Sequence, residues 1–313
     1  MRRILITGGA GFIGSDLAET LLKDERNFIV LVDDLSTGNI VKLPIQANER
    51  WRFIKCDVND YRDISGVMQS FHFDYVFHYA ALVGVKRTQE HPVKVLHDLH
   101  GIENILNLCK NSEVKRVFFS SSSEVYGEPV EFPQNEQTTP LNSRVPYAVV
   151  KNIGEAFLRS YQKEFNLDFT IFRFFNTYGP KQSRDFVMTR FIDLALKNKN
   201  ITIYGDGSQT RTFCYIDDNI DACVNAFYNN LHINEVINIG SNIEISILDL
   251  AKLIIKLTNS NSKIVHMPEL EEGDMKRRFP DICKMMKLLN RDPLPIEEGI
   301  KKVLSSKLFL KNI

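Results

Sequence analysis

The chain has 313 residues, of which 43% are hydrophobic, and its 39 lysines and arginines balance 39 aspartates and glutamates. A chain of this size can bury a sizeable core in one large domain or in two unequal ones. The formal net charge of zero gives no electrostatic footprint for nucleic acid or for a membrane surface, so we expect neither as a partner.

The sequence carries no clear signal for export, membrane insertion or metal binding. No apolar run approaches the roughly 18 residues that a membrane-spanning helix needs. Arg2 and Arg3 followed by apolar residues resemble a signal peptide, but a cluster of glycines interrupts the run and Asp16 follows, so we expect mature protein from residue 1. The odd number of cysteines and their lack of CxxC spacing predict buried free thiols in a cytoplasmic protein, with no disulfide framework and no metal site. The cysteines are Cys56, Cys109, Cys214, Cys223 and Cys283.

Strand-like and helix-like segments alternate along the first 176 residues. The expected strands are 2–7, 28–33, 51–56, 74–79, 114–120 and 168–175, and the expected helices are 11–24, 60–70, 91–111 and 144–166. This alternation is typical of the α/β class and predicts a Rossmann-type, doubly wound parallel sheet. After residue 176 the regularity is lost, so we expect a dinucleotide-binding domain at 1–176 and a smaller substrate-binding region at 177–313, with some C-terminal elements returning to the first domain.

A glycine-rich turn, ILITGGAGFIG, joins the first strand to the first helix. Gly8 allows the tight turn, Gly11 lets the backbone approach a pyrophosphate, and Gly14 lets the helix pack closely on the strand. The helix begins near Phe12, so Phe12 and Ile13 join these glycines in the expected cofactor site.

An acidic residue ends the second strand. Asp33 lies 25 residues past Gly8, near the spacing at which a carboxylate accepts hydrogen bonds from the adenosine ribose hydroxyls. Its charge would repel a 2′-phosphate, which favours NAD over NADP. The alternative is that Asp33 only opens the turn formed by residues 35–38.

Tyr147 and Lys151 stand four residues apart in PYAVVK and share one face of the expected helix. A phenol titrates near pH 10 and is a poor base at neutral pH unless a neighbouring cation favours the phenolate. Lys151 is placed to supply that charge. In isolation the same spacing more often belongs to an amphipathic surface helix.

Eight motifs occur in the order seen in the extended short-chain dehydrogenases that act on nucleotide sugars. They are TGGAGFIG (7–14), Asp33, CDV (56–58), HYAA (78–81), SSSSEVYG (120–127), PYAVVK (146–151), FFNTYGP (174–180) and YGDGSQTRTFCYIDD (204–218). The chain resembles this group, the NAD-dependent epimerase/dehydratase family, over about residues 2 to 290. The resemblance implies NAD as cofactor and a nucleoside-diphosphate sugar as partner.

The resemblance also implies roles for particular residues. Asp57 and Val58 match the pair that contacts adenine, and Ala80 and Ala81 match the backbone beside the nicotinamide ribose. Ser122 matches the catalytic serine or threonine that hydrogen-bonds the sugar hydroxyl deprotonated by the tyrosine, with Ser123 beside it in the substrate site. The residues that match the diphosphate clamp are Asn176, Arg211 and either Arg277 or Arg278, since a guanidinium meets phosphate oxygens bidentately.

The residues after Ser122 bear on the fate of the sugar once C4 has been oxidised. This stretch resembles that of sugar 4,6-dehydratases of the dTDP-glucose type. Those enzymes carry an Asp-Glu pair where this chain has Ser123-Glu124. The acid is missing and the base is present, which is closer to UDP-glucuronate decarboxylases and GDP-mannose 4,6-dehydratases. Glu124 is therefore a candidate catalytic base, with a structural role beside an arginine as its alternative.

Three departures from the family pattern make a UDP-galactose 4-epimerase less expected. Asp98 stands where Asn is common, and Thr212 stands where Asp is common. Glu271 and Glu272 precede Gly273-Asp274, where those epimerases place arginine.

We therefore expect NAD-dependent oxidation at C4 of a nucleoside-diphosphate sugar, most simply in an epimerase or dehydratase. A decarboxylase comes next, and a 4-dehydrogenase that releases the ketone comes last. A non-catalytic dinucleotide sensor is the alternative from another class. The resemblance also implies a homodimer that pairs through helices at 91–111 and 144–166.

Overall fold

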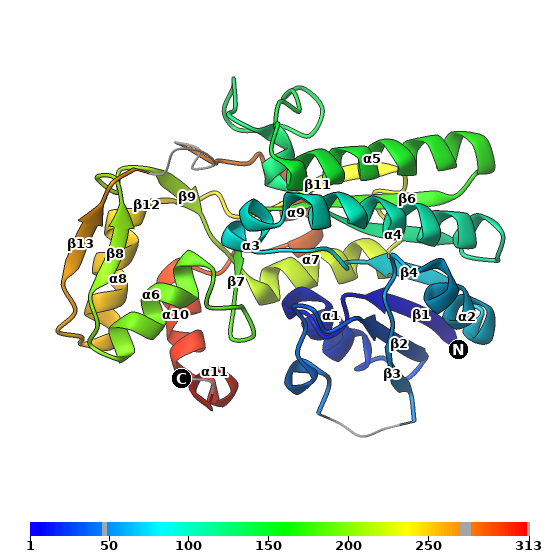
Figure 1. The fold of residues 1–313 in the computed structure, drawn as a ribbon, viewed down its shortest axis with the longest axis horizontal. Coiled ribbons are helices and arrows are strands. Elements are labelled where there is room, and N and C mark those ends of the chain that lie inside the picture. Colours follow the sequence, from blue (N-terminus) through cyan, green and yellow to red (C-terminus); the bar gives the residue numbers. More distant parts are fainter. Residues whose placement is uncertain (46–48, 270–276, 312–313) are drawn as a thin grey trace. The chain divides into compact units, whose positions relative to one another are not determined.

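A computed structural model describes residues 1–45, 49–269 and 277–311 of the chain (Figure 1). These residues form two compact units. Unit 1 comprises Met1–Val125, Pro146–Arg173 and Ile220–Ile237, and unit 2 comprises Tyr126–Val145, Phe174–Asn219 and Asn238–Ile313. The chain crosses between the units several times, so the compact units do not divide at residue 176. The assignment of cofactor and substrate binding to the two parts of the chain stays a prediction.

The core of unit 1 is a seven-stranded sheet, as far as the described residues show, in the order β11-β6-β5-β4-β1-β2-β3. The strands are β1 (Arg2–Thr7), β2 (Asn27–Asp33), β3 (Trp51–Lys55), β4 (Tyr75–His78), β5 (Arg116–Ser122), β6 (Asp168–Phe174) and β11 (Glu235–Ile239). β1 pairs in parallel with both β2 and β4, so the strand order reverses beside β1. The predicted doubly wound α/β fold is confirmed, and such a reversal is where these sheets bind ligands.

The four predicted helices are present beside these strands, together with two helices that the sequence pattern did not predict. They are α1 (Phe12–Leu21), α2 (Tyr61–Phe71), α3 (Val85–Glu90), α4 (Pro92–Lys110), α5 (Pro146–Phe165) and α7 (Ile216–Tyr228), with short 3₁₀ turns η1 (Ile40–Lys42) and η2 (Ser123–Tyr126). Figure 1 shows α4 and α5 side by side. The sequence pattern missed α3 and α7. β5 begins and ends two residues later than expected, so Ser121 and Ser122 belong to the strand.

Successive side chains of each strand point to opposite faces of the sheet. Phe119 of β5 belongs to one core cluster together with Ile105 of α4 and Val150 of α5. On the opposite face, the rings of Phe77 and Phe118 stack at 4.3 Å, and Phe227 of α7 meets both edge-on. Both faces are thus covered by helices, as a parallel sheet requires.

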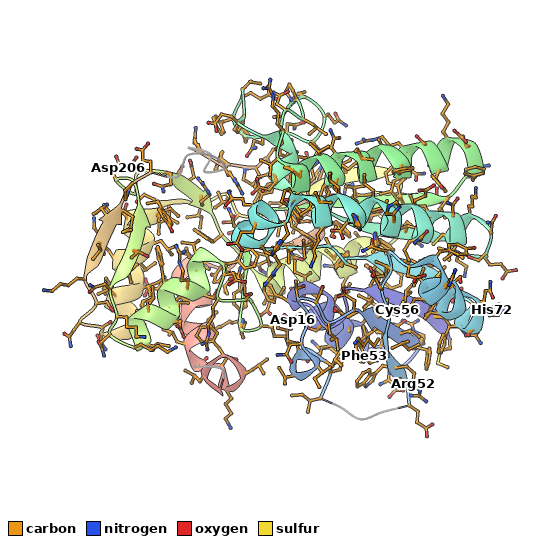
Figure 2. All side chains as sticks on the ribbon, in the orientation of Figure 1. Asp16, Arg52, Phe53, Cys56, His72 and Asp206 are labelled. Atoms are coloured by element: carbon orange, nitrogen blue, oxygen red, sulfur yellow. The ribbon has the colours of Figure 1, made fainter. Side chains whose placement is uncertain are left out.

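β3 forms one edge of this sheet. Its side chains include the exposed Arg52 and the partly buried Phe53, both labelled in Figure 2. A charged side chain on an edge strand opposes further strand pairing.

Unit 2 is built from short elements, as expected after residue 176. Its strands are β7 (Thr177–Tyr178), β8 (Ile201–Tyr204), β9 (Thr210–Thr212), β10 (Cys214–Tyr215), β12 (Glu244–Ser246) and β13 (Ile264–Met267), and its helices are α6 (Val187–Leu196), α8 (Ile247–Thr258), α9 (Cys283–Leu289), α10 (Ile296–Ser305) and α11 (Lys307–Lys311). β7 pairs in parallel with β10, and β8 pairs in parallel with β13. β9 pairs antiparallel with β12.

No helix among the described residues is long and apolar enough to cross a bilayer. All five cysteines are described, and none of them forms a disulfide bond. Four are buried as predicted, but Cys283 is exposed, because it starts α9 at the surface and its backbone N–H is held by the Asp281 carboxylate at 2.9 Å.

Candidate active site

The turn between β1 and α1 leaves no room for side chains at its glycines. Gly8 has φ +67°, and a Cβ there would lie 2.9 Å from the backbone of Tyr79. A Cβ on Gly11 would lie 2.9 Å from the carbonyl oxygen of Gly8, and one on Gly14 would lie closer still. Gly11 is also the N-cap of α1, which continues through Phe12 and Ile13. A bare helix N-terminus of this kind attracts a pyrophosphate, so the turn fits a dinucleotide.

Asp33 ends β2 and is only 7% exposed. Its Oδ2 accepts a hydrogen bond from the Ala10 N–H at 3.0 Å, and its Oδ1 accepts one from the Leu35 N–H at 2.9 Å. Burial raises the pKa of Asp33, and these two donors counter part of that rise. Since a carboxylate can accept about four hydrogen bonds, Asp33 has acceptor capacity for ribose hydroxyls while also opening the turn after β2.

Thr7, at the end of β1, holds the loop that follows β4. Its Oγ1 accepts hydrogen bonds from the Tyr79 and Ala80 N–H groups, each at 3.0 Å. The same hydroxyl lies 2.9 Å from Nδ1 of His78. Burial lowers the pKa of His78 to about 3, so the ring is neutral. This network places Ala80 and Ala81 at the carboxyl end of β4, and sequence patterns do not reveal it because Thr7 and His78 are 71 residues apart.

Asp57 and Val58 follow β3. Asp57 Oδ1 accepts from the Asn59 N–H at 2.9 Å. Val58 is buried, and its carbonyl accepts from Asn104 Nδ2 at 3.0 Å. Both therefore lie in an ordered loop at the carboxyl end of the sheet, as an adenine contact would need.

The predicted catalytic residues meet where β5 faces α5. The Tyr147 phenol hydrogen-bonds Ser122, whose Oγ also accepts from the Glu124 N–H at 3.1 Å. Lys151 is 3% exposed and its Nζ donates to Ser120 Oγ at 3.4 Å. That Nζ lies 5.8 Å from the centre of the Tyr147 ring.

Burial is the largest influence on the pKa values of both Tyr147 and Lys151. Burial raises the pKa of Tyr147, and the charge of Glu124 adds to the rise. Burial lowers the pKa of Lys151 to about 8, opposed by the charge of Asp98. The charge of Lys151 is therefore expected to matter most when the phenol must lose its proton, and its role as the cation beside Tyr147 stays a prediction.

Two carboxylates lie near the phenol. Glu124 is half-buried in η2, next to the fully buried Ser123. Asp98 of α4 accepts a hydrogen bond from the Leu82 N–H at 2.7 Å, and its charge raises the pKa of both Tyr147 and Lys151. In the sequence, Asp98 stands out only as a departure from the family pattern.

The residues expected to hold a diphosphate gather around β9 in unit 2. Asn176 Nδ2 donates to the carbonyl of Thr212 at 3.1 Å, and Arg211 is buried. Arg277 instead forms a two-pronged ion pair with Glu244 at 2.8 and 2.7 Å and stacks 4.4 Å from the Phe132 ring. Arg278 is 7% exposed. The two candidates thus differ in their surroundings, and the choice of phosphate ligand between them stays a prediction.

Glu271 and Glu272, with the neighbouring Gly273-Asp274, lie outside the described residues. Their part in excluding a UDP-galactose 4-epimerase therefore stays a prediction from the sequence.

Comparison with known proteins identifies the family. Residues 4–240 match the family described as "NAD dependent epimerase/dehydratase family". The chain is 35% identical over 328 residues to the UDP-N-acetyl-alpha-D-glucosaminuronate decarboxylase of Bacillus cytotoxicus, covering 97% of each chain.

Solved structures agree in fold. The UDP-glucose 4-epimerase of Thermotoga maritima with UDP-glucose has a TM-score of 0.90 at 29% identity, covering 99% of each chain. The UDP-glucuronic acid 4-epimerase of Bacillus cereus, in complex with UDP-glucuronic acid and NAD, has a TM-score of 0.88 at 32% identity, covering 99% of each chain. The chain belongs to the NAD-dependent epimerase/dehydratase family, and it is an NAD-dependent enzyme.

Proposed function

We propose that this enzyme oxidises C4 of a UDP-sugar and forms a 4-keto sugar as its intermediate. The observation that carries the proposal is the meeting of Ser122, Tyr147 and Lys151 between β5 and α5, in the same unit as the glycine turn and Asp33. The choice of UDP rests on the substrates named for the similar proteins.

The cofactor residues are those of unit 1. Gly8, Gly11 and Gly14 leave space for a pyrophosphate, Asp33 accepts from ribose hydroxyls, and the 57–58 and 80–81 loops complete the site. Bound NAD would supply the acceptor for the two electrons that leave C4.

Tyr147 removes the O4 proton, and the Ser122 hydroxyl orients O4 toward it. Because burial holds the pKa of Tyr147 above its ordinary value, the phenolate depends on positive charge close by. Lys151 provides such a charge only while it is protonated, which its pKa of about 8 allows at neutral pH.

The diphosphate contacts in this proposal come from two arginine side chains. Arg211 and Arg278 are buried cations whose planar forks suit phosphate oxygens. Asn176 holds the carbonyl of Thr212 and keeps β9, which carries Arg211, in place. Arg277 has a structural role through its ion pair with Glu244.

The first candidate for the fate of the ketone is its reduction from the opposite face, which makes the enzyme a 4-epimerase. This route needs no further acid or base. Dehydration across C5 and C6 needs an acid for the departing oxygen, and position 123 carries a serine hydroxyl instead of a carboxyl group.

The second candidate is decarboxylation of a UDP-uronate, and Glu124 is the observation that favours it. A C4 ketone makes the C6 carboxylate a β-keto acid, which loses CO₂ and leaves a carbanion at C5 that needs a proton. Glu124, whose charge acts on Tyr147, is our candidate for the group that delivers that proton.

Turnover of UDP-glucose, UDP-N-acetylglucosamine and UDP-glucuronate in deuterated water separates these candidates. An epimerase gives a product of unchanged composition with inverted C4 and no deuterium at C5. A decarboxylase gives a UDP-pentose with deuterium at C5, and a dehydratase gives a 6-deoxy-4-keto product with deuterium at C5. Failure of every UDP-sugar to generate bound NADH or any product rejects the proposal.

We also propose a homodimer through α4 and α5. A hollow on this surface is lined by Lys110 at the end of α4 and by residues of α5, among them Phe157, Tyr161 and Phe165. Phe165 is exposed, and Lys110 Nζ lies 4.3 Å from its ring centre. Phe165→Glu is expected to give a monomer by light scattering; an unchanged dimer places the interface elsewhere.

A further inference from the structure

Three consecutive serines at the end of β5 each hold one side chain of α5. Ser122 bonds Tyr147, and Ser120 accepts from Lys151. Ser121 Oγ donates to Glu155 Oε1 at 2.7 Å. Residues 147, 151 and 155 lie at successive turns on one face of the helix. The catalytic face of α5 is thus tied to β5 at three points, and the third point serves no step of the proposed mechanism.

Glu155 is at the centre of a buried ionic cluster. Its side chain is fully buried and accepts two hydrogen bonds from Arg173 of β6, from Nε at 2.8 Å and from the terminal nitrogen at 2.7 Å. Arg159, one turn further along α5, adds a contact at 3.2 Å. Burial raises the pKa of Glu155, but the bonds from Arg173 and Ser121 outweigh it and leave the pKa lowered. The carboxylate is therefore charged and fully bonded.

Stability alone does not explain an ion pair in this position. Moving two charges out of water costs free energy that their attraction only partly returns, and apolar pairs of similar volume often stabilise a core as well or better. What the ion pair adds is a fixed geometry. Its two parallel bonds fix Glu155 against β6 while Ser121 fixes it against β5, so α5 can neither rotate nor slide without breaking bonds.

We propose that Glu155 and Arg173 are positioning residues that set the register of α5, and through it the places of Tyr147 and Lys151. The proposal rests on the proposed function, because it takes those two residues as catalytic. A helix rises about 1.5 Å per residue, so a slip of even part of one residue moves the phenol far enough to cost up to about 100-fold in rate. The pKa of Lys151 is shifted by burial and by the charge of Asp98, and Glu155 is not among its causes. We therefore expect Glu155 to act on catalysis through geometry.

The test is the double variant Glu155→Leu/Arg173→Met, which removes both charges and keeps the core apolar. Its melting temperature should equal or exceed that of the native enzyme. We expect kcat on the preferred UDP-sugar to fall about 10- to 100-fold while KM and the Kd for NAD stay within about twofold. Native kcat in a stably folded double variant overturns the proposal, as does a loss confined to KM.

Two further variants keep the test decisive if the double variant fails to fold. Ser121→Ala removes only the bond from Glu155 to β5, and it should lower kcat several-fold with little change in melting temperature. Arg159→Ala removes the half-exposed arm of the cluster, and it should keep native kcat. Unchanged kcat in Ser121→Ala, or an equal loss in Arg159→Ala, overturns the proposal.

Tyr147→Phe, measured in parallel, separates the two proposals. If Tyr147→Phe turns over at the native rate, the proposed function fails whatever Glu155 does. If Tyr147→Phe is inactive and the double variant is fully active, only the positioning role fails.

Discussion

Asp33 Oδ2 accepts a hydrogen bond from the Ala10 N–H at 3.0 Å, so the carboxylate that ends β2 is tied to the glycine turn that follows β1. The other oxygen of Asp33 holds Leu35. One buried side chain therefore fixes the loops that follow β1 and β2, and the strand order of the sheet reverses on the other side of β1. A ligand in that position would meet the turn and the carboxylate together.

Asp33→Ala is expected to raise the Kd for NAD at least about tenfold, since a hydrogen bond to a charged group is worth about 1.5 to 3 kcal/mol. Titration calorimetry measures the change. Asp34→Ala is the matched control, because Asp34 is exposed and its carboxylate bonds the neighbouring Ser36; its NAD affinity should stay native. Unchanged affinity in a folded Asp33→Ala enzyme removes Asp33 from the cofactor site.

The fold and the cofactor turn could be predicted because their signals are local in sequence. The glycines, Asp33 and the alternation of strands and helices are each visible within a window of a few residues. Ser122, Tyr147 and Lys151 could be assigned because they sit in short motifs of a known family. Their contacts in the structure agree with that assignment, and their roles stay predictions.

The features that could not be predicted depend on burial and on pairing between distant residues. The Tyr147–Lys151 spacing does not reveal that burial raises the pKa of the phenol. Glu155 and Arg173 are separated by 18 positions, and neither is unusual alone. Arg277 pairs with Glu244, which lies 33 positions away. Such pairs appear only when the chain is folded.

Lys151→Met should stabilise the protein while removing most of its activity. Burial lowers the pKa of Lys151 from 10.5 to about 8. Below pH 8 the side chain is therefore protonated in both the folded and the unfolded state, and the buried ammonium lowers the free energy of unfolding by its full amount. Since one pKa unit corresponds to about 1.4 kcal/mol, that cost is up to about 3 kcal/mol at pH 7. The gain in unfolding free energy should shrink between pH 8 and 10.5, where the native fold loses this proton first. Urea unfolding of both proteins at about pH 7 and pH 10 checks the sign; a less stable variant at neutral pH contradicts it.

Asp98→Asn should shift the pH profile of kcat to lower pH. The charge of Asp98 raises the pKa of both Tyr147 and Lys151, so its removal lowers both, while the amide oxygen can still accept from the Leu82 N–H. Glu103→Gln, an exposed change on the same helix, is the control and should leave the profile in place. A profile for Asp98→Asn that stays fixed or moves to higher pH would refute this electrostatic link.

Alanine substitutions of Arg277 and Arg278 should have different effects on substrate binding and on stability. Arg278→Ala is expected to raise KM for the UDP-sugar about 10- to 100-fold, as loss of a charged hydrogen bond predicts, with NAD affinity unchanged. Arg277→Ala breaks the ion pair with Glu244, so it should lower the melting temperature more than it affects substrate binding. Steady-state kinetics and thermal unfolding decide the matter, and a larger rise in KM for Arg277→Ala reverses the assignment.

Glu124→Gln should leave the first oxidation intact and affect only the later conversion of the 4-keto sugar. The charge of Glu124 raises the pKa of Tyr147, so its loss makes the phenol easier to ionise and formation of bound NADH should not slow. If the native reaction moves a proton at C5, product formation should slow by about 100- to 10,000-fold, as loss of a general acid or base predicts, and the 4-keto sugar should accumulate. If the native reaction is 4-epimerisation, the variant should turn over at nearly the native rate.

Single-turnover absorbance of the reduced nicotinamide, combined with mass spectrometry of quenched samples in deuterated water, measures both steps. A variant that no longer forms NADH with substrate would place Glu124 in the first step and contradict its assignment to C5. If instead the ketone appears only when an external oxidant is supplied to the native enzyme, the protein is a 4-dehydrogenase, and the remaining role of Glu124 is to bind substrate.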